Sequence, residues 1–337
     1  MRVLVTGGAG YIGSHTTLAL LASGYEVVIL DNLCNSSLTA VARTEELAGK
    51  KIPFIKADLC DAKAVDEAFT KYGPFDAVIH FAALKAVGES VAQPLRYYEN
   101  NINGSIELAK AMKKHGVKRI VFSSSATVYG DPLKVPVTED EPIKATNPYG
   151  QTKAMMEQIL ADTARAEKWH LASLRYFNPV GAHKSGRIGE DPVGTPNNLV
   201  PFVAQVAVGM REKVTIFGGD WPTPDGSGVR DYIHVLDLAD AHVAALKAIW
   251  NEPCVINPNV GTGRGYSVKE VVETFRKVSG KTIPAVIGPR RPGDVANVVG
   301  NPAYAEKVLK WKAKYDLQDM IADSWRWQEQ NPKGYRE

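Results

Sequence analysis

The chain has 337 residues, of which 45% are hydrophobic and 23% charged, and its formal net charge is +3. This length allows one large or two ordinary domains with a full core, and the composition is that of a globular protein rather than a disordered or fibrous one. The small net charge, without any dense run of lysine and arginine, argues against a nucleic-acid partner, and no apolar run is long enough to span a bilayer.

The three cysteines, Cys34, Cys60 and Cys254, lie far apart and form no CxxC or Cys/His pattern. They argue against a disulfide framework or a zinc site and favour a reducing compartment. The first residues show no secretory pattern, because the apolar segment at Val3 is short and is stopped at once by glycine. We therefore expect a cytoplasmic protein with no metal, no membrane partner and no nucleic acid.

Short apolar segments rich in β-branched residues alternate with amphipathic ones in the first half of the chain. The apolar segments predict strands at 2–6, 26–30, 52–56, 76–81, 119–123 and 171–176. Helices are expected between them, notably at 12–23, at 94–114 and from Pro148 onward. This alternation predicts an α/β fold with a doubly wound parallel sheet of the Rossmann type.

The pattern changes after Asn178. Residues 178–196 are rich in Gly, Pro, Asp and His without periodicity and predict a loop, beyond which the elements are shorter and mixed. A helix at 237–250 and a strand at 254–257 are expected to rejoin the first sheet. We therefore expect a nucleotide-binding domain at 1–178, rejoined by 236–260, and a smaller mixed α/β domain made of 179–235 and 261–337.

A glycine-rich turn follows the first strand, with glycines at Gly7, Gly10 and Gly13. Glycine lets the backbone turn tightly and approach a pyrophosphate, which binds at the positive end of the following helix. The pattern alone is weak, but its place between a predicted strand and a predicted helix indicates a dinucleotide site.

Two acidic residues follow strands near this turn. Asp31 stands where a carboxylate would accept from the ribose hydroxyls of adenosine and repel a 2′-phosphate, which favours NAD over NADP. A helix-capping or turn aspartate is the alternative. Asp58 ends the third strand near the expected adenine, or is a solvated turn residue.

Tyr149 and Lys153 stand four residues apart, so they share one face of the helix that Asn147 and Pro148 are expected to begin. Ser125 lies upstream at the end of a strand. A free phenol has a pKa near ~10, so Tyr149 needs positive charge nearby to act as a base, and both an ammonium and a cationic nicotinamide would lower its pKa. Beside the glycine turn, the triplet predicts proton and hydride transfer.

Together these features resemble the extended short-chain dehydrogenase/reductase family, and the match extends over essentially the whole chain. It is most specific for the members that epimerise nucleotide sugars, at residues 78–90, 123–130, 174–183, 196–199 and 228–235. The resemblance implies that the chain is a NAD-dependent isomerase that interconverts UDP-glucose and UDP-galactose. It also implies that the chain forms a homodimer.

The resemblance also implies roles for single residues. Ser125 would bond the reacting hydroxyl, Tyr149 would be the acid/base, and Lys153 would bond the nicotinamide ribose and polarise Tyr149. The implied cofactor-binding residues are Gly7, Gly10, Tyr11, Ile12, Gly13, Asp31, Asn32, Asp58, Leu59, Phe81, Ala82, Lys85, Asn100, Ser123, Tyr149, Lys153, Tyr176 and Phe177. The implied substrate-binding residues are Lys85, Ser125, Tyr149, Asn178, Asn198, Leu199, Thr215, Ile216, Phe217, Arg230, Arg291, Asp294 and Val298.

The implied reaction is a closed redox cycle at C4 of the sugar. Tyr149 takes the hydroxyl proton while hydride passes to NAD, the keto sugar swings about its bond to the diphosphate, and hydride and proton return to the other face. Val298 departs from the family pattern, because several members carry a tyrosine there, beside the 2-substituent of the sugar. The extra room leaves the pair UDP-GlcNAc and UDP-GalNAc open as further substrates.

Two alternatives remain at this stage. A nucleotide-sugar 4,6-dehydratase shares the fold and the first hydride step, but it needs an Asp-Glu pair where this chain has Ala126 and Thr127. A non-catalytic NAD sensor is the other alternative, although such a protein could dispense with Tyr149 and Lys153.

Overall fold

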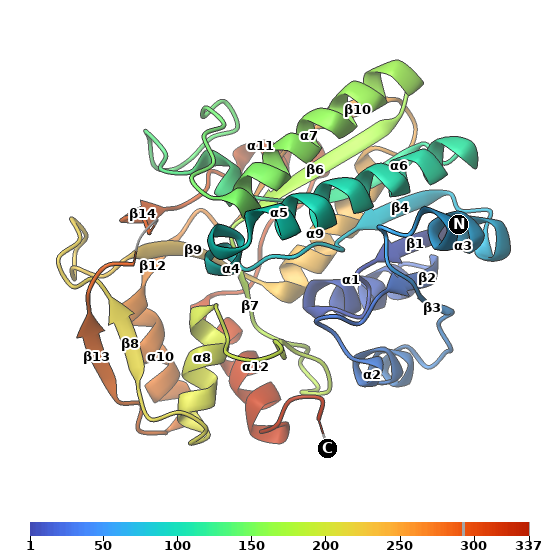
Figure 1. The fold of residues 1–337 in the computed structure, drawn as a ribbon. Helices are drawn as coiled ribbons and strands as arrows, with labels where there is room; N and C mark the ends of the chain where they lie inside the picture. Colours follow the sequence, from blue (N-terminus) through green and yellow to red (C-terminus); the bar gives the residue numbers. More distant parts are fainter. Residues whose placement is uncertain (292–293, 337) are drawn as a thin grey trace.

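The computed structural model describes residues 1–291 and 294–336. A large parallel sheet with helices on both faces lies beside a smaller lobe of short strands and helices (Figure 1). This is the α/β, doubly wound fold expected from the sequence. Within the described ranges, no helix combines the length and the apolar character that a membrane span requires.

All paired strands of the large sheet run parallel. Across the sheet they follow the order β10 (Cys254–Ile256), β6 (His170–Tyr176), β5 (Arg119–Ser125), β4 (Ala77–His80), β1 (Arg2–Thr6), β2 (Glu26–Asp31) and β3 (Phe54–Lys56), with β11 (Asn259–Val260) also beside β6. The chain order reverses between β1 and β4. In open α/β sheets this reversal opens a crevice at the carboxyl ends of the strands, where ligands bind.

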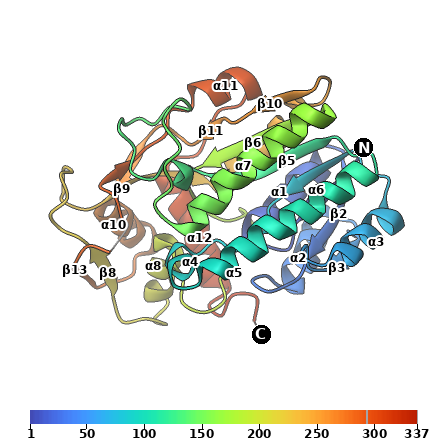
Figure 2. The same ribbon diagram turned by 45° about the horizontal axis from the view of Figure 1, so that its top comes forward.

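Helices cover both faces of this sheet. One face carries α1 (Tyr11–Ala22), α2 (Leu38–Ala48), α9 (Val235–Ala248) and α11 (Ala303–Leu309). The other carries α3 (Ala62–Tyr72), α6 (Gly104–Lys114) and α7 (Pro148–Glu167), of which α6 and α7 lie side by side in Figure 2. Because side chains alternate along a strand, Val3 and Val5 of β1 pack on one face and Leu4 on the other.

The helical segment expected at 94–114 is present, but it is not one regular α-helix. The structure has α4 (Val87–Ala92), α5 (Pro94–Tyr98), a wider π-helical turn η1 (Glu99–Asn103) and then α6. Asn101 explains the widened turn, since its side chain accepts from Leu84 N (2.8 Å) and donates to Leu84 O and Thr152 Oγ1 (both 3.0 Å). Such turns often mark functional sites, and η1 also carries Asn100.

The smaller lobe holds two further sheets. One contains β7 (Asn178–Val180), β9 (Val229–His234), β12 (Gly265–Ser267) and β14 (Asn297–Val298), and the other pairs β8 (Val214–Phe217) with β13 (Ala285–Gly288). Its helices α8 (Leu199–Ala207), α10 (Val268–Ser279) and α12 (Leu317–Gln330) share a core that includes Val203, Phe275 and Met320. The loop expected from Asn178 is therefore wrong for its first three residues, because they pair with β9 as a strand.

Candidate active site

A cavity of about 540 Å³ opens at the carboxyl ends of the strands, where the order of the sheet reverses. The structure brings every residue of the expected cofactor set to its wall, together with Ser125, Asn178 and Asn198. Residues that follow β1 and β4 meet there with residues at the ends of β2 and β5 and in the first turns of α7. The cavity thus joins the glycine turn, the acidic residues and the Ser-Tyr-Lys triplet in one place.

The glycine turn has no room for side chains. Gly7 has a φ of +69°, and a Cβ on it would lie 2.7 Å from the backbone nitrogen of Ala82. A Cβ on Gly13 would lie 2.2 Å from the carbonyl oxygen of Gly7. Helix α1 begins at Tyr11 and its cap, Gly10, offers no side-chain partner, so the first N–H groups of the helix suit an anionic ligand.

Asp31 ends β2 and is only 7% exposed. Its carboxylate accepts from Ala9 N (3.1 Å), Leu33 N (2.8 Å) and Ser36 Oγ (2.8 Å). The residue therefore holds the glycine turn and also lines the cavity, so the two roles considered for it from sequence are not exclusive.

Asp58 faces Asn32 across the same end of the cavity, with 2.8 Å between Asn32 Nδ2 and Asp58 Oδ2. Burial raises the pKa of Asp58, but hydrogen bonds from Cys60 and Asn32 outweigh it and hold that pKa below its usual value.

The Ser-Tyr-Lys triplet is assembled by β5 and α7. Ser125 is the last residue of β5, and its Oγ accepts from Thr127 N (3.2 Å) and Thr127 Oγ1 (3.0 Å). Asn147 caps α7 by accepting from Gly150 N at 2.9 Å, as the sequence predicts, and this places Tyr149 in the first turn. Tyr149 is hydrogen-bonded with Ser125, and Lys153 Nζ donates to the carbonyl oxygen of Ser123 at 2.6 Å.

The protein side chains alone do not lower the pKa of Tyr149, which differs from the expectation from sequence. Burial raises the pKa of Tyr149 to about 12, and the hydrogen bond with Ser125 opposes this only in part. Burial lowers the pKa of Lys153 to about 7, against the negative charge of Glu157, which raises it. The expected lowering of the phenol pKa is therefore not supplied by this chain's residues alone, because desolvation outweighs the ammonium 5.9 Å from the ring.

Glu157 belongs to a buried polar layer beneath the triplet that the sequence did not reveal. Arg175 Nη2 lies 2.6 Å from Glu157 Oε2, both side chains are 7% exposed, and Ser124 also donates to Glu157. Removing one partner of such a pair leaves an uncompensated buried charge. The layer fixes α7 against β5 and β6 and so fixes the position of Lys153.

The remaining residues of the expected substrate set do not line this cavity. They are Leu199, Thr215, Ile216, Phe217, Arg230, Arg291, Asp294 and Val298. Most gather on the smaller lobe: Val298 pairs with Arg230 between β14 and β9, and Arg291 lies over the ring of Phe217 (4.6 Å) and 2.9 Å from Asp294. Ile216 is buried, so its side chain faces the lobe's core.

Arg230 stands at the centre of this second group. Burial lowers the pKa of its guanidinium, the nearby Asp294 raises it, and Arg291 lowers it. Val298 packs beside the apolar cluster of Ala126 and Phe177, and Phe177 lines the cavity. The second group therefore adjoins the cavity through Phe177.

Sequence reasoning missed Glu190, which lies in the cavity wall. Its Oε1 lies 3.1 Å from Lys85 Nζ and 2.9 Å from Asn198 Nδ2, so one buried carboxylate holds two residues of the expected site. Glu190 lies in an aperiodic loop, 105 residues from Lys85 and eight from Asn198, and no local pattern marks it.

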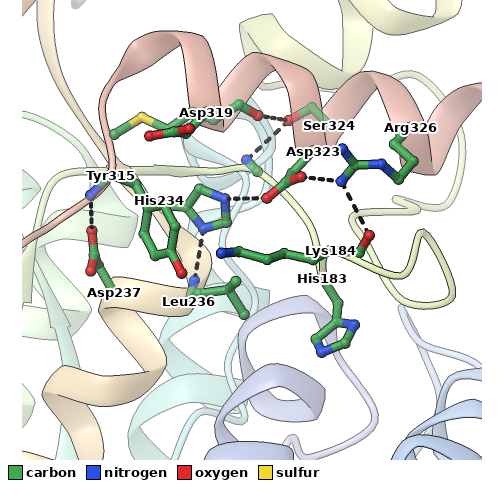
Figure 3. A network of polar contacts seen from close by, with 12 residues as sticks. His183, Lys184, His234, Leu236, Asp237, Tyr315, Asp319, Asp323, Ser324 and Arg326 are labelled. Carbon is green, nitrogen blue, oxygen red and sulfur yellow. Dashed lines mark hydrogen bonds and ion pairs between the residues drawn. The ribbon is translucent and has the colours of Figure 1, made fainter.

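A polar network joins α12 to the end of β9 (Figure 3), and Tyr11 connects this network to the glycine turn. Tyr11 donates to the carbonyl oxygen of Gly181 at 2.7 Å, and Gly181 N donates to Ser324 Oγ at 3.0 Å. His234, at the end of β9, lies 3.2 Å from Asp323 Oδ2 through its Nε2. The smaller lobe is thus hydrogen-bonded to the glycine turn.

Comparison with known proteins agrees with this geometry. The family model of GDP-mannose 4,6 dehydratase matches residues 4–324. A UDP-glucose 4-epimerase of Bacillus subtilis is 60% identical over 337 residues, covering 100% of this chain and 99% of the relative. The dehydratase alternative is not favoured, since the relatives of high identity are epimerases.

Solved structures point the same way. The crystal structure of UDP-glucose 4-epimerase from Bifidobacterium longum in complex with NAD+ and UDP has a TM-score of 0.96 and 51% identity, and covers 99% of this chain and 100% of that chain. The UDP-Glc/GlcNAc 4-epimerase from Campylobacter jejuni has a TM-score of 0.85 and 37% identity, with coverage of 98% and 99%. The chain therefore belongs to the UDP-glucose 4-epimerases, within the wider nucleotide-sugar family whose model it matches.

Proposed function

We propose that this chain interconverts UDP-glucose and UDP-galactose through transient oxidation at C4, with NAD held throughout the cycle. The observation that carries the proposal is the meeting of Ser125, Tyr149 and Lys153 with the glycine turn in one cavity. The Bifidobacterium longum relative, crystallised with NAD+ and UDP, supports both ligands.

The proposed cofactor site runs along the carboxyl ends of the strands. The free N–H groups at the start of α1 bind the pyrophosphate, Asp31 binds the adenosine ribose, and Asp58 with Asn32 borders the adenine. Lys153 and Lys85 lie toward the nicotinamide. Bound NAD supplies the hydride acceptor of the first half-reaction and the hydride donor of the second.

Proton transfer falls to Tyr149. Its phenolate accepts the proton of the C4 hydroxyl, which Ser125 orients, and returns that proton after the keto sugar has turned over. Burial keeps the pKa of this phenol at about 12 in the protein alone. The positive charge of the oxidised nicotinamide, added to that of Lys153, favours the phenolate when the site is filled.

The substrate is held by both groups of residues. The guanidinium forks of Arg230 and Arg291 suit the diphosphate. Arg291 lies over one face of the exposed Phe217 ring, and the rest of that ring would border the uracil. Asn178, Asn198 and Leu199 border the sugar, while Thr215 and Ile216 contribute backbone groups beside Phe217. Anchoring at the diphosphate leaves the sugar free to present either face to Tyr149.

The N-acetylated pair UDP-GlcNAc and UDP-GalNAc is a second candidate substrate. Val298 stands near the catalytic end of the site, beside Phe177 and Ala126, and is smaller than tyrosine. The Campylobacter jejuni neighbour is named as an epimerase of both sugar types.

We further propose a cytoplasmic homodimer. Val91 on α4 and Leu95 on α5 are 62% and 81% exposed, and both helices pack against α7, where Met155 is 38% exposed. A second copy of the chain would cover this apolar face. The sedimentation coefficient of Leu95→Lys should fall from that of the wild-type dimer toward that of a monomer. A coefficient equal to that of a dimeric wild type would show that the interface does not include Leu95.

We also propose that the two domains bind different ligands. Residues 1–178 with 236–260 bind NAD, and residues 179–235 with 261–337 bind the nucleotide sugar. The parallel pairing of β10 and β11 with β6 supports the inclusion of 236–260 in the first unit.

One experiment tests the activity directly. The purified protein is mixed with UDP-galactose and no added NADH, and UDP-glucose is followed by chromatography. Steady formation of UDP-glucose supports the epimerase, a 4-keto-6-deoxy product would indicate a dehydratase, and no product with NAD bound would indicate a sensor.

A further inference from the structure

One segment crosses the mouth of the nucleotide cavity without being part of the sheet or of the catalytic helix. Residues 189–193 all line the cavity, and we call them the crossing segment. At one end Glu190 bonds Lys85, and at the other Val193 N donates to Asn35 Oδ1 at 3.0 Å. Since Asn35 follows the β2 end that carries Asp31, the segment reaches from the catalytic end to the adenosine end.

This segment has no regular structure of its own, and further anchors come from α12 and the residues after it. Trp327 Nε1 donates to Glu190 O at 3.1 Å. The hydroxyl of Tyr335 accepts from Gly189 N at 3.1 Å and lies 3.2 Å from Gly189 O, to which it donates. Tyr335 N donates to Asp191 Oδ2 at 2.9 Å. Figure 1 shows the end of the chain beside this yellow-green loop.

The fit between the two segments is close. A Cβ on Gly189 would lie 2.3 Å from Trp327 Cγ, and a Cβ on Gly334 would lie 2.1 Å from Asp191 Oδ1. The ring of Tyr335 lies 4.8 Å from that of Trp327, and Arg43 of α2 lies 5.4 Å above it. The phenol is therefore held in one orientation, with its hydroxyl directed at the backbone of Gly189.

The crossing segment carries two acidic residues, and the protein supplies partners for both. Glu190 and Asp191 would repel a dinucleotide diphosphate, and Coulomb repulsion is strong at short range in a partly buried site. Lys85 compensates Glu190, while Asp191 is met by Tyr335 N and by Arg336 at 3.7 Å.

We propose that Tyr335 is a positioning residue for the cofactor: its hydroxyl fixes the backbone of Gly189, holds the crossing segment over the nucleotide cavity, and so slows the release of bound NAD. This rests on the proposed NAD site but concerns release rather than chemistry. Tyr335 acts through Gly189 and Glu190, and it takes no part in proton transfer.

The test compares Tyr335→Phe with wild type and with Tyr304→Phe as a matched control. Tyr304 lies on α11, which packs against α9 away from the cavity. NAD release from the purified holoenzyme is followed by trapping free NAD with a second dehydrogenase. Loss of the two hydroxyl bonds should make release roughly tenfold faster in Tyr335→Phe and leave it unchanged in Tyr304→Phe.

Measuring kcat at excess NAD, beside the rate of NAD release, distinguishes a positioning role of Tyr335 from a general loss of stability. With NAD in excess, the kcat of Tyr335→Phe should return to within about twofold of wild type, and amide exchange should rise at 189–193 but not in β1. A second variant that stops at Gly334 should release NAD at least as fast. Wild-type release rates in both variants would overturn the proposal, as would a kcat that excess NAD does not restore. If wild type holds no NAD at all, the proposed cofactor site fails instead.

Discussion

Lys153 Nζ lies 5.9 Å from the ring centroid of Tyr149, one turn earlier on α7. The ammonium does not bond the phenol but donates to the carbonyl oxygen of Ser123. This geometry gives Lys153 an electrostatic role toward Tyr149 and leaves the phenol hydroxyl free for Ser125 and a substrate hydroxyl. Substitutions of Tyr149 and of Lys153 should therefore have different effects.

Tyr149→Phe should reduce kcat by about 10²–10⁴-fold while the protein still purifies with NAD, because only the proton-transfer group is lost. Lys153→Ala should lower both kcat and NAD content, since it removes a buried cation beside the nicotinamide end. Turnover and released nucleotide are measured on the same preparations. Near-normal turnover in Tyr149→Phe would refute the acid/base assignment.

Asp31 predicts the identity of the bound cofactor. Wild type should release NAD and no NADP on denaturation, because the carboxylate would repel a 2′-phosphate. Asp31→Asn keeps the shape but removes the charge that Ala9 N, Leu33 N and Ser36 Oγ share. The variant should therefore retain less NAD and discriminate less against NADP, by roughly tenfold. NADP in the wild-type preparation would contradict the assignment.

Arg230→Lys tests whether the guanidinium of Arg230 binds the diphosphate of the substrate. This change keeps the charge but loses the planar fork, so the Kd for UDP should rise about tenfold while NAD content is unchanged. Arg290→Lys is the matched control, because Arg290 pairs with Asp220 at 2.8 Å and lies over Trp221. Isothermal titration with UDP measures both, and equal affinities in the two variants would remove Arg230 from the site.

Three buried histidines predict how stability depends on pH. Burial lowers the pKa of His15 and His80 to about 3 and that of His242 to about 4. The unfolded chain binds protons on these rings below about pH 6.5, whereas the folded chain does not. The unfolded state thus holds more protons, and the free energy of unfolding should fall as the pH drops from about 6.5 to 4.

Urea denaturation at pH 7.5 and pH 5 measures this fall. His242→Phe keeps a ring beside Phe81 and removes one of the protons, so its loss of stability between the two pH values should be smaller than that of wild type. Equal stability of the wild type at both pH values would show that these histidines do not control the acid limb.

The sequence predicted those parts of the site that follow strands. The glycine turn, Asp31, Ser125 and the Tyr149 helix each stand at the end of a predicted strand or the start of a predicted helix, so the parallel sheet brings them together. Glu190 and Tyr335 could not be found in this way. They lie in aperiodic segments, and they reach the cavity only through contacts between distant parts of the chain.

The π-helical turn at η1 and the pKa of Tyr149 were also beyond sequence reasoning. The turn depends on Asn101 meeting Leu84 and Thr152, which are distant in sequence. The pKa depends on how deeply the phenol is buried, and spacing along a helix cannot reveal burial. Local patterns thus predicted part of the residues that line the cavity but not the environment of their side chains.

Val298 makes the last prediction, on substrate range. An acetamido group is several heavy atoms larger than a hydroxyl, and a tyrosine ring at this position would occupy that volume beside Phe177 and Ala126. Overpacking typically costs about 1–3 kcal/mol, or roughly a ten- to hundredfold change in equilibrium. Val298→Tyr should therefore reduce kcat/KM for UDP-GalNAc by this factor and leave kcat/KM for UDP-galactose nearly unchanged.

Val298→Ile is the matched control, since it adds one methylene and no ring. Both variants and the wild type are assayed with the two sugar pairs under the same conditions. Because β14 pairs with β9 at Arg230, UDP affinity is measured in parallel to show that the larger side chain has not displaced the guanidinium. Equal N-acetyl activity in wild type and Val298→Tyr would show that this position does not control access of the larger sugar.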